Sequence, residues 1–547
     1  MRLNPKAGKW LFVVLALWFL MFLCLPMLQL LTESWQENGQ FSGSHYRQII
    51  GDEKFRQAWF NSLNIAALSA LSATVLAFLP AYAIHRTALP KPFKQGLRFG
   101  MLFPMLLPTI TYGFAIIYTF GKQGLLTQIL HTQIFSDLYG FKGLWLGYTL
   151  YTLPTAFLLL SNTFHYLDKK CVLVSLLMGD SAWRRFGTTV LQPLVGTLAA
   201  AFIQCFFLSF TDFGIPASIG GKYEVVAIRL YTEMLGSSPS FGRGAVAALS
   251  MLLPAVVSVA MLSWLSRFNA AMPHTQTTVL PRCVWADYAW GAVSAMLVLA
   301  ILSPFAVILI VPWVQSWPYV LSFSTFTVWD VLTTPNLTAV YRNTLWAALF
   351  TALAGTVLSF SAALLRERMA LPRAGKIGIE AAALASNTIP GMVLGIAYLM
   401  LFSGSLIANT LMIIVVCNIA HYFATPYLMS KNALEKMNQG WEATAALMGD
   451  SWLKTLRRVI LPNALPTLLE MFAYYFVNAM VTVSAVIFLA GAHSMVLTGK
   501  IKELQHFGKF DEIFVLSAMI MLTNLLVLAL LGGWRYWRQR RQIPTSI

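Results

Sequence analysis

The chain has 547 residues, of which 58% are apolar and 11% charged, and its mean hydropathy is +0.67. These values lie far outside the balance of a soluble globular chain and indicate a polytopic membrane protein. The net charge of +17 is spread over short loops between apolar runs, so we expect anionic membrane lipids as its counter-ions and no nucleic-acid partner.

Twelve apolar runs are long enough to cross the hydrocarbon core as helices, which takes about 20 residues. We therefore predict an all-α fold with about twelve transmembrane helices. The runs lie near residues 10–31, 58–84, 99–120, 143–165, 190–211, 244–266, 287–312, 343–365, 378–402, 407–429, 466–490 and 513–534. Most Lys and Arg residues fall in alternate loops, which places both termini in the cytosol by the positive-inside rule.

The second half of the sequence repeats the first. From Asn61 onward, residues recur at an offset of 282, so that Pro108 and Gly113 return as Pro390 and Gly395. An even number of spans per copy predicts two parallel six-helix repeats with the pathway between them. We expect a first repeat at 1–266, a short cytosolic linker at 267–286 and a second repeat at 287–547.

Two charged segments between spans share a pattern. We name them the first elbow (168–193) and the second elbow (440–466), and they contain LLMGDS and ALMGDS. In each, a short helix is predicted to end at a left-handed glycine, and Asp or Ser then caps an amphipathic helix lying at the membrane surface. The residues concerned are Gly179, Asp180 and Ser181 in one elbow and Gly449, Asp450 and Ser451 in the other.

The end of the fifth span in each half has a broken pattern. Gly214 and Pro216 interrupt the helix in 209–231, and irregular backbone at membrane depth is tolerated where it is covered by protein or lines a cavity. Two interpretations are open, a gate segment at the outer mouth or an ordinary solvated loop. The polar candidates are Asp212, Lys222 and Arg229, with His493 in the corresponding stretch of the second half.

A few polar residues lie inside or beside apolar runs. Asn387 precedes Pro390 and is a candidate for the pathway, although a proline there also fits a kink between packed helices. Glu380 and Glu470 lie near helix ends and favour a structural role as partners of loop Arg or Lys residues. His421 favours a neutral, hydrogen-bonded role between helices over that of a ligand.

No phosphate loop, HExxH, CxxC or GxSxG motif occurs, so we expect no enzyme activity, catalytic residue, cofactor or metal. Two classes of transporter remain. A permease worked by a separate motor explains the paired elbows. An ion-coupled secondary transporter needs a buried ion site at the midplane, and it leaves the elbows unexplained.

The second elbow resembles the cytoplasmic loop motif of ABC importer permeases. The spacing from Gly449 to Val459, Leu461 and Pro462 fits that motif, while the motif's glutamate falls at Ala443, one place after Glu442. The first elbow departs further, with Leu173, Thr189 and Gln192 at motif positions. The whole chain, notably FTDFGIPASIGG and AVAALSMLLPAVVSV, resembles the fused permeases of the iron(III), thiamine and 2-aminoethylphosphonate importers.

This resemblance implies a type I importer fold in the bacterial inner membrane. It also implies a homodimer of ATPase subunits on the cytosolic side and a substrate-binding protein outside. Of the three cargoes, 2-aminoethylphosphonate fits best, and iron(III) and thiamine are the alternatives. The motif carries ATPase coupling over to Glu442, Ala443, Gly449, Asp450, Ser451, Leu461 and Pro462, with Gly179, Asp180 and Ser181 in the first elbow.

Overall fold

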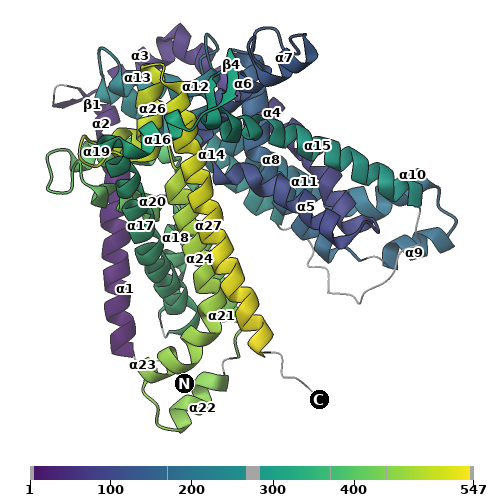
Figure 1. Cartoon of the computed structure of the whole chain (residues 1–547). Helices are drawn as coiled ribbons and strands as arrows, with labels where there is room; N and C mark the ends of the chain where they lie inside the picture. The colour runs from purple at the N-terminus through teal and green to yellow at the C-terminus, as the bar shows by residue number, and fades with distance from the viewer. Residues whose placement is uncertain are drawn as a thin grey trace.

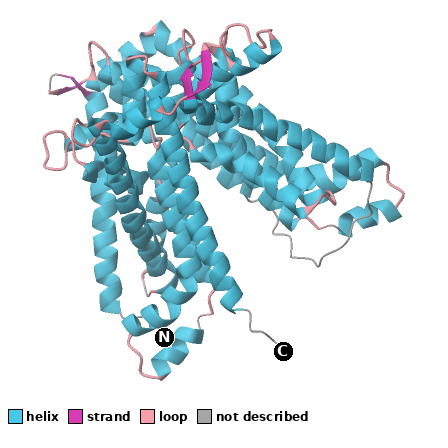
Figure 2. Ribbon diagram, viewed as in Figure 1, coloured by secondary structure: helices cyan, strands magenta, loops and turns pink. Residues whose placement is uncertain are grey.

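The computed structural model describes residues 5–37, 39–168, 170–266, 284–369, 371–438 and 440–542. This part of the chain is almost entirely helical (Figure 2), which confirms the predicted all-α class. Its strands are confined to two small antiparallel hairpins, β1 (Gln36–Glu37) with β2 (Gln40–Phe41) and β3 (Val314–Ser316) with β4 (Val320–Phe323).

The helices of the first half come in the following order. They are α1 (Pro5–Phe19), η1 (Leu20–Cys24), α2 (Leu25–Trp35), α3 (Ser44–Gly51), α4 (Glu53–Arg86), α5 (Lys91–Leu102), η2 (Phe103–Leu106), α6 (Thr109–Phe120), α7 (Leu125–Leu130), α8 (Phe141–Tyr166), α9 (Lys170–Leu177), α10 (Ala182–Phe186), η3 (Gly187–Leu191), α11 (Gln192–Thr211), α12 (Gly214–Ile219), α13 (Val226–Leu235) and α14 (Phe241–Ser266).

The second half follows a similar order. Its helices are α15 (Val284–Ile310), η4 (Val311–Trp313), α16 (Phe326–Thr333), α17 (Pro335–Arg368), α18 (Arg373–Ala385), η5 (Ser386–Thr388), α19 (Gly391–Phe402), α20 (Leu411–His421), α21 (Ala424–Lys436), α22 (Gly440–Leu447), α23 (Trp452–Thr455), η6 (Leu456–Ile460), α24 (Leu461–Val481), α25 (Val486–Leu489), α26 (Leu497–His506) and α27 (Phe510–Gln542).

Within the described residues, nine helices are long and apolar enough to cross a membrane, and three bent helix pairs bring the number to twelve. Three of the predicted runs, 99–120, 378–402 and 407–429, are not straight, and the first two bend most sharply. The chain turns by 112° between η2 and α6 and by 106° between η5 and α19. Pro108 and Pro390 explain both turns, because a proline disfavours helical backbone at the residue before it, and Leu107 and Ile389 are extended.

Several elements of the two halves have matching bounds. Helices α4 and α17 are each 34 residues long and are separated by the predicted offset of 282 residues. The same offset relates α3 to α16 and α6 to α19. These correspondences support the predicted duplication.

The halves interlock through their first spans. Helix α1 packs against α17 and α2 packs against α19, and the Tyr398 hydroxyl donates to the Phe22 carbonyl at 2.6 Å. In return, α15 packs against α4, α5 and α6 of the first half. Of the predicted linker, 267–283 lie outside the described residues and 284–286 form the first turn of α15. Each half is therefore completed by a span from the other.

The helices converge at one end of the molecule and spread apart at the other (Figure 1). We call these the joined end, which carries α12, α13 and α26, and the elbow end. One leg contains α5, α8 and α11 and reaches α9 and α10, and the other contains α17, α21 and α24 and reaches α22 and α23. The two elbows therefore lie at the tips of separate legs, on the same end of the molecule.

Candidate functional site

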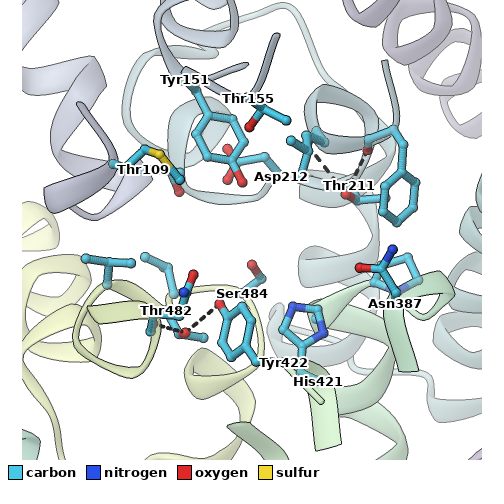
Figure 3. A pocket seen from close by; sticks show the side chains of 18 of the residues that line it. Thr109, Tyr151, Thr155, Thr211, Asp212, Asn387, His421, Tyr422, Thr482 and Ser484 are labelled. Carbon is cyan, nitrogen blue, oxygen red and sulfur yellow. Dashed lines mark hydrogen bonds between the residues drawn. The ribbon is translucent and has the colours of Figure 1, made fainter. Parts of the chain in front are cut away.

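A cavity of about 310 Å³ lies where the two halves meet. It is built from the places where helices break, since the chain bends at Pro390 and α11 and α24 end beside it. Irregular backbone of this kind persists inside a membrane protein when it lines a cavity. The polar side chains on its walls include Thr109, Tyr151, Thr155, Thr211 and Asp212 from the first half and Asn387, His421, Tyr422, Thr482 and Ser484 from the second (Figure 3).

Hydrogen bonds hold Asp212 at the wall of this cavity. Its side chain caps α12, because the Oδ2 atom accepts a hydrogen bond from the Ile215 N–H at 2.9 Å, and the Thr109 hydroxyl also bonds to the carboxylate. The neighbouring Gly214 allows this close approach, since a Cβ atom there would lie 2.2 Å from Thr109 Oγ1. Asp212 itself is only 5% exposed.

The facing wall comes from the second half. His421 and Tyr422 lie at the bend between α20 and α21, and the Tyr422 hydroxyl shares a hydrogen bond of 2.7 Å with Thr482 Oγ1. Figure 3 shows Asp212 and Tyr151 on one side of the space and His421 and Tyr422 on the other. The cavity therefore presents oxygen-rich, mostly neutral groups from both halves.

The joined end is closed by contacts between the halves. Gln505 Nε2 of α26 donates to the Ala217 carbonyl of α12 at 2.8 Å, and Lys502 Nζ lies 3.5 Å from the same oxygen. Burial lowers the pKa of Lys502, as expected for an ammonium group between two helices. These bonds tie the two halves together at the joined end.

The other predicted gate residues lie away from the cavity. Arg229 joins an ion-pair network, at 3.0 Å from Asp52 and 3.9 Å from Glu233. Lys222 is exposed in the turn after α12, and His493 is exposed with its carbonyl accepting from Asn343 at 3.1 Å. The structure thus brings Asp212 and Asn387 to the cavity, places Gly214 and Pro216 in α12 behind it, and leaves the three basic residues outside.

Both elbows turn at a left-handed glycine, as predicted. Gly179 and Gly449 each have φ +76°, and the turns close with N–H bonds from Asp180 to the Ser175 carbonyl and from Asp450 to the Ala445 carbonyl. Ser181 accepts a capping bond from the Arg184 N–H at 3.4 Å, whereas Ser451 makes no such bond and Asp450 pairs with Lys454. The elbow tips are apolar and exposed, at Leu177, Met178, Leu447 and Met448.

The prediction that the second helix of each elbow lies separately on the membrane surface is wrong. Helices α23, η6 and α24 run on as one 30-residue helix, Trp452–Val481, and α10, η3 and α11 do the same over Ala182–Thr211. A π-helical turn precedes the proline in both, at η6 before Pro462 and at η3 before Pro193. The wider turn accommodates the missing proline N–H without ending the helix. Leu461 and Pro462 therefore belong to a membrane span.

Glu442 does not point away from the protein. Its Oε1 atom lies 3.0 Å from Arg368 Nη1, and Arg368 Nη2 donates to the Met437 carbonyl at 2.8 Å. The side chains are 14% and 3% exposed, so this ion pair fastens α22 to the end of α17, while Ala443 is exposed. Sequence reasoning missed this pair, because its members are far apart in the chain.

The first elbow lacks an equivalent of this ion pair. Arg86 occupies the position that matches Arg368, but Val172 stands where the second half has Glu442. The three guanidinium nitrogens of Arg86 are buried, and none has a hydrogen-bond partner among the described residues.

The acidic residues at helix ends have the structural role that the sequence favours. Glu380 lies 2.7 Å from both Arg366 and Lys431. Glu470 lies 2.7 Å from Arg535. Neither carboxylate lines the cavity.

Interlocked membrane-spanning halves, a cavity between them and two elbows at one end define a polytopic permease. Residues 355–542 match the family described as the inner membrane component of binding-protein-dependent transport systems. This match lies within the second half of the chain, which is therefore similar to the inner membrane permeases of ABC importers.

Relatives extend the similarity over the whole chain. The ferric transport system permease protein FbpB of Actinobacillus pleuropneumoniae is 22% identical, covering 96% of this chain and 78% of that protein. The spermidine/putrescine permease PotC of Escherichia coli K12 is 24% identical over 44% of this chain and 88% of its own. The molybdenum permease ModB of Haemophilus influenzae is 25% identical over 38% of this chain and 91% of its own. All three are named as transport permeases rather than enzymes.

Proposed function

We propose that this chain forms the translocation pathway of an ATP-driven importer, with the cavity as its central compartment. Both elbows and both termini face the cytosol, where two identical ATPase subunits bind the elbows, including Gly179 to Ser181 and Gly449 to Ser451. A substrate-binding protein delivers cargo to the joined end from outside.

One observation carries this proposal. The helix Ala182–Thr211 begins in the first elbow and ends beside Asp212, and the helix Trp452–Val481 begins in the second elbow and ends beside Thr482. Each is 30 residues long, or about 45 Å at the helical rise per residue. A continuous helix transmits displacement along its length, so movement of the elbows moves the cavity walls directly.

In the arrangement seen here the legs are apart and the joined end is closed. Closure of the ATPase pair would bring the elbows together, pivot the two helices and weaken the contact of Gln505 with Ala217. The cavity would then open outward to receive cargo, and it would face the cytosol again after ATP hydrolysis.

For the cargo we propose the group suggested by the sequence, with 2-aminoethylphosphonate as one candidate. Iron(III) is the second candidate, and the similarity to FbpB favours it.

Reconstitution tests the function. We expect co-purification of the chain with an ATPase and a binding protein, and proteoliposomes holding all three should take up cargo only when ATP is supplied to the elbow side. Uptake that needs an ion gradient and ignores ATP would establish a secondary transporter instead. Purified chain alone should hydrolyse no ATP.

A further inference from the structure

The cavity wall carries a negative side chain and no permanently positive one among the described residues. Among the described residues that line it, Asp212 is the one carboxylate, and neither Lys nor Arg is present. The remaining titratable side chains are His421 and the phenols Tyr112, Tyr151, Tyr422 and Tyr474. A cargo that enters this space therefore meets one negative group and no permanent positive group.

The negative group belongs to one half. The corresponding break after α24 presents Thr482, Val483 and Ser484, which are all uncharged. Asp212 itself follows directly on the helix that rises from the first elbow. Motion of this elbow would therefore move the carboxylate relative to the neutral facing wall.

The need to cap α12 does not by itself explain why residue 212 is an aspartate. Asparagine and serine cap helices about as well as aspartate, and they carry no charge that must be desolvated. An ionisable group inside a membrane is costly, and no cationic side chain in the cavity lining offsets the cost at Asp212. A positive charge on a passing ligand would do so.

We propose that Asp212 binds a positively charged group of the cargo during passage, so that the pathway carries cations or molecules with a cationic end and disfavours pure oxyanions. This inference rests on the proposed function and deepens it. A hydrated metal cation would meet carboxylate and hydroxyl oxygens. An organic ammonium would in addition meet the ring faces of Tyr151 and Tyr422, which attract cations.

The test compares Asp212→Asn and Asp212→Glu with the wild-type chain, each expressed with its ATPase and binding protein. Initial uptake of radiolabelled iron(III), thiamine and 2-aminoethylphosphonate is measured, together with the ATPase activity stimulated by loaded binding protein. Asn keeps the cap and removes only the charge. Asp330→Asn removes the same charge from an exposed helix outside the cavity and serves as the matched control.

We expect Asp212→Asn to lower uptake roughly tenfold or more, the range for losing a charge-assisted bond, while stimulated ATPase activity persists. Asp212→Glu should retain most of the uptake, and Asp330→Asn all of it. The inference would be overturned if Asp212→Asn took up cargo at the wild-type rate, or if it lost uptake and ATPase stimulation together. It would also be overturned if the cargo proved to carry no positive charge. Absence of any ATP-dependent uptake by the wild-type complex would refute the proposed function and the inference with it.

Discussion

The ion pair between Glu442 and Arg368 makes a sharp prediction about the second elbow. Helix α22 has eight residues, too few for a stable helix in water without tertiary contacts. The pair supplies a buried contact that joins this helix to α17. The change Glu442→Gln removes the negative charge beside Arg368, which is 3% exposed, and leaves it only neutral acceptors, the amide oxygen of Gln and backbone carbonyls.

The size of the effect follows from the burial. Breaking a buried ion pair by removing one partner costs about 3–5 kcal/mol. Burial raises the pKa of Glu442 even with Arg368 beside it, so desolvation of the carboxylate outweighs the attraction of the pair. We therefore expect a smaller loss of about 1–3 kcal/mol, because Arg368 loses its counter-charge and keeps only neutral acceptors. Local opening of α22 should become about 10 to 100 times more frequent.

Hydrogen exchange measured by mass spectrometry on the complex in nanodiscs tests this. Amides in 440–447 should exchange faster in Glu442→Gln by about that factor, while those in 170–177 stay unchanged. Val172→Glu provides the reciprocal test, since it places a carboxylate near the unpartnered Arg86 and should slow exchange in 170–177. Unchanged exchange at 440–447 in Glu442→Gln would refute the view that this pair holds the elbow.

Three further predictions concern other parts of the molecule. Gly449→Val should uncouple ATP hydrolysis from uptake in proteoliposomes, because φ +76° costs a branched residue about 1–2 kcal/mol, and normal coupling would contradict this. Gln505→Ala removes the hydrogen bond to the Ala217 carbonyl and should loosen the joined end. A small solute should then leak faster from proteoliposomes in the absence of ATPase, and an unchanged leak rate would show that this bond does not close the joined end. The Lys54 N–H and Arg229 lower the pKa of Asp52 against the effect of burial, so its contribution to stability is complete above about pH 3.9 and disappears as the pH falls through the lower folded-state pKa. Melting curves recorded against pH should show a smaller acid loss in Asp52→Asn than in the wild type, and equal losses would contradict this.

Local signals in the sequence predicted much of the fold. The apolar runs gave the spans, and the glycines at 179 and 449 gave the turns of the elbows. The stretches around Pro108 and Pro390 were predicted to be single spans, without their sharp bends. A proline indicates that a helix is interrupted, but it does not indicate the angle of the bend. The exchange of α1 and α15 between the halves depends on tertiary packing that no local pattern encodes.

The cavity was predicted in part. Asp212 and Asn387 were found because charged and amide groups stand out in apolar runs. Tyr151 and Tyr422 were not, since tyrosine is common where helices pack, and only the breaks around it reveal a cavity. The polar pattern also suggested Arg229, but it could not show that Asp52 and Glu233 already neutralise this residue.

If the proposed function is correct, both elbows face the cytosol, where an ATPase can bind them, and the joined end faces outward. Single cysteines at Leu447 and Lys222, both exposed, report on the two ends, and the exposed native Cys171 reports on the first elbow. The measurement is labelling of intact cells with a membrane-impermeant maleimide, followed by peptide mapping. The cysteine at 222 should react from outside, and those at 171 and 447 should react only after the membrane is opened. Labelling of position 447 or 171 in intact cells would contradict the account.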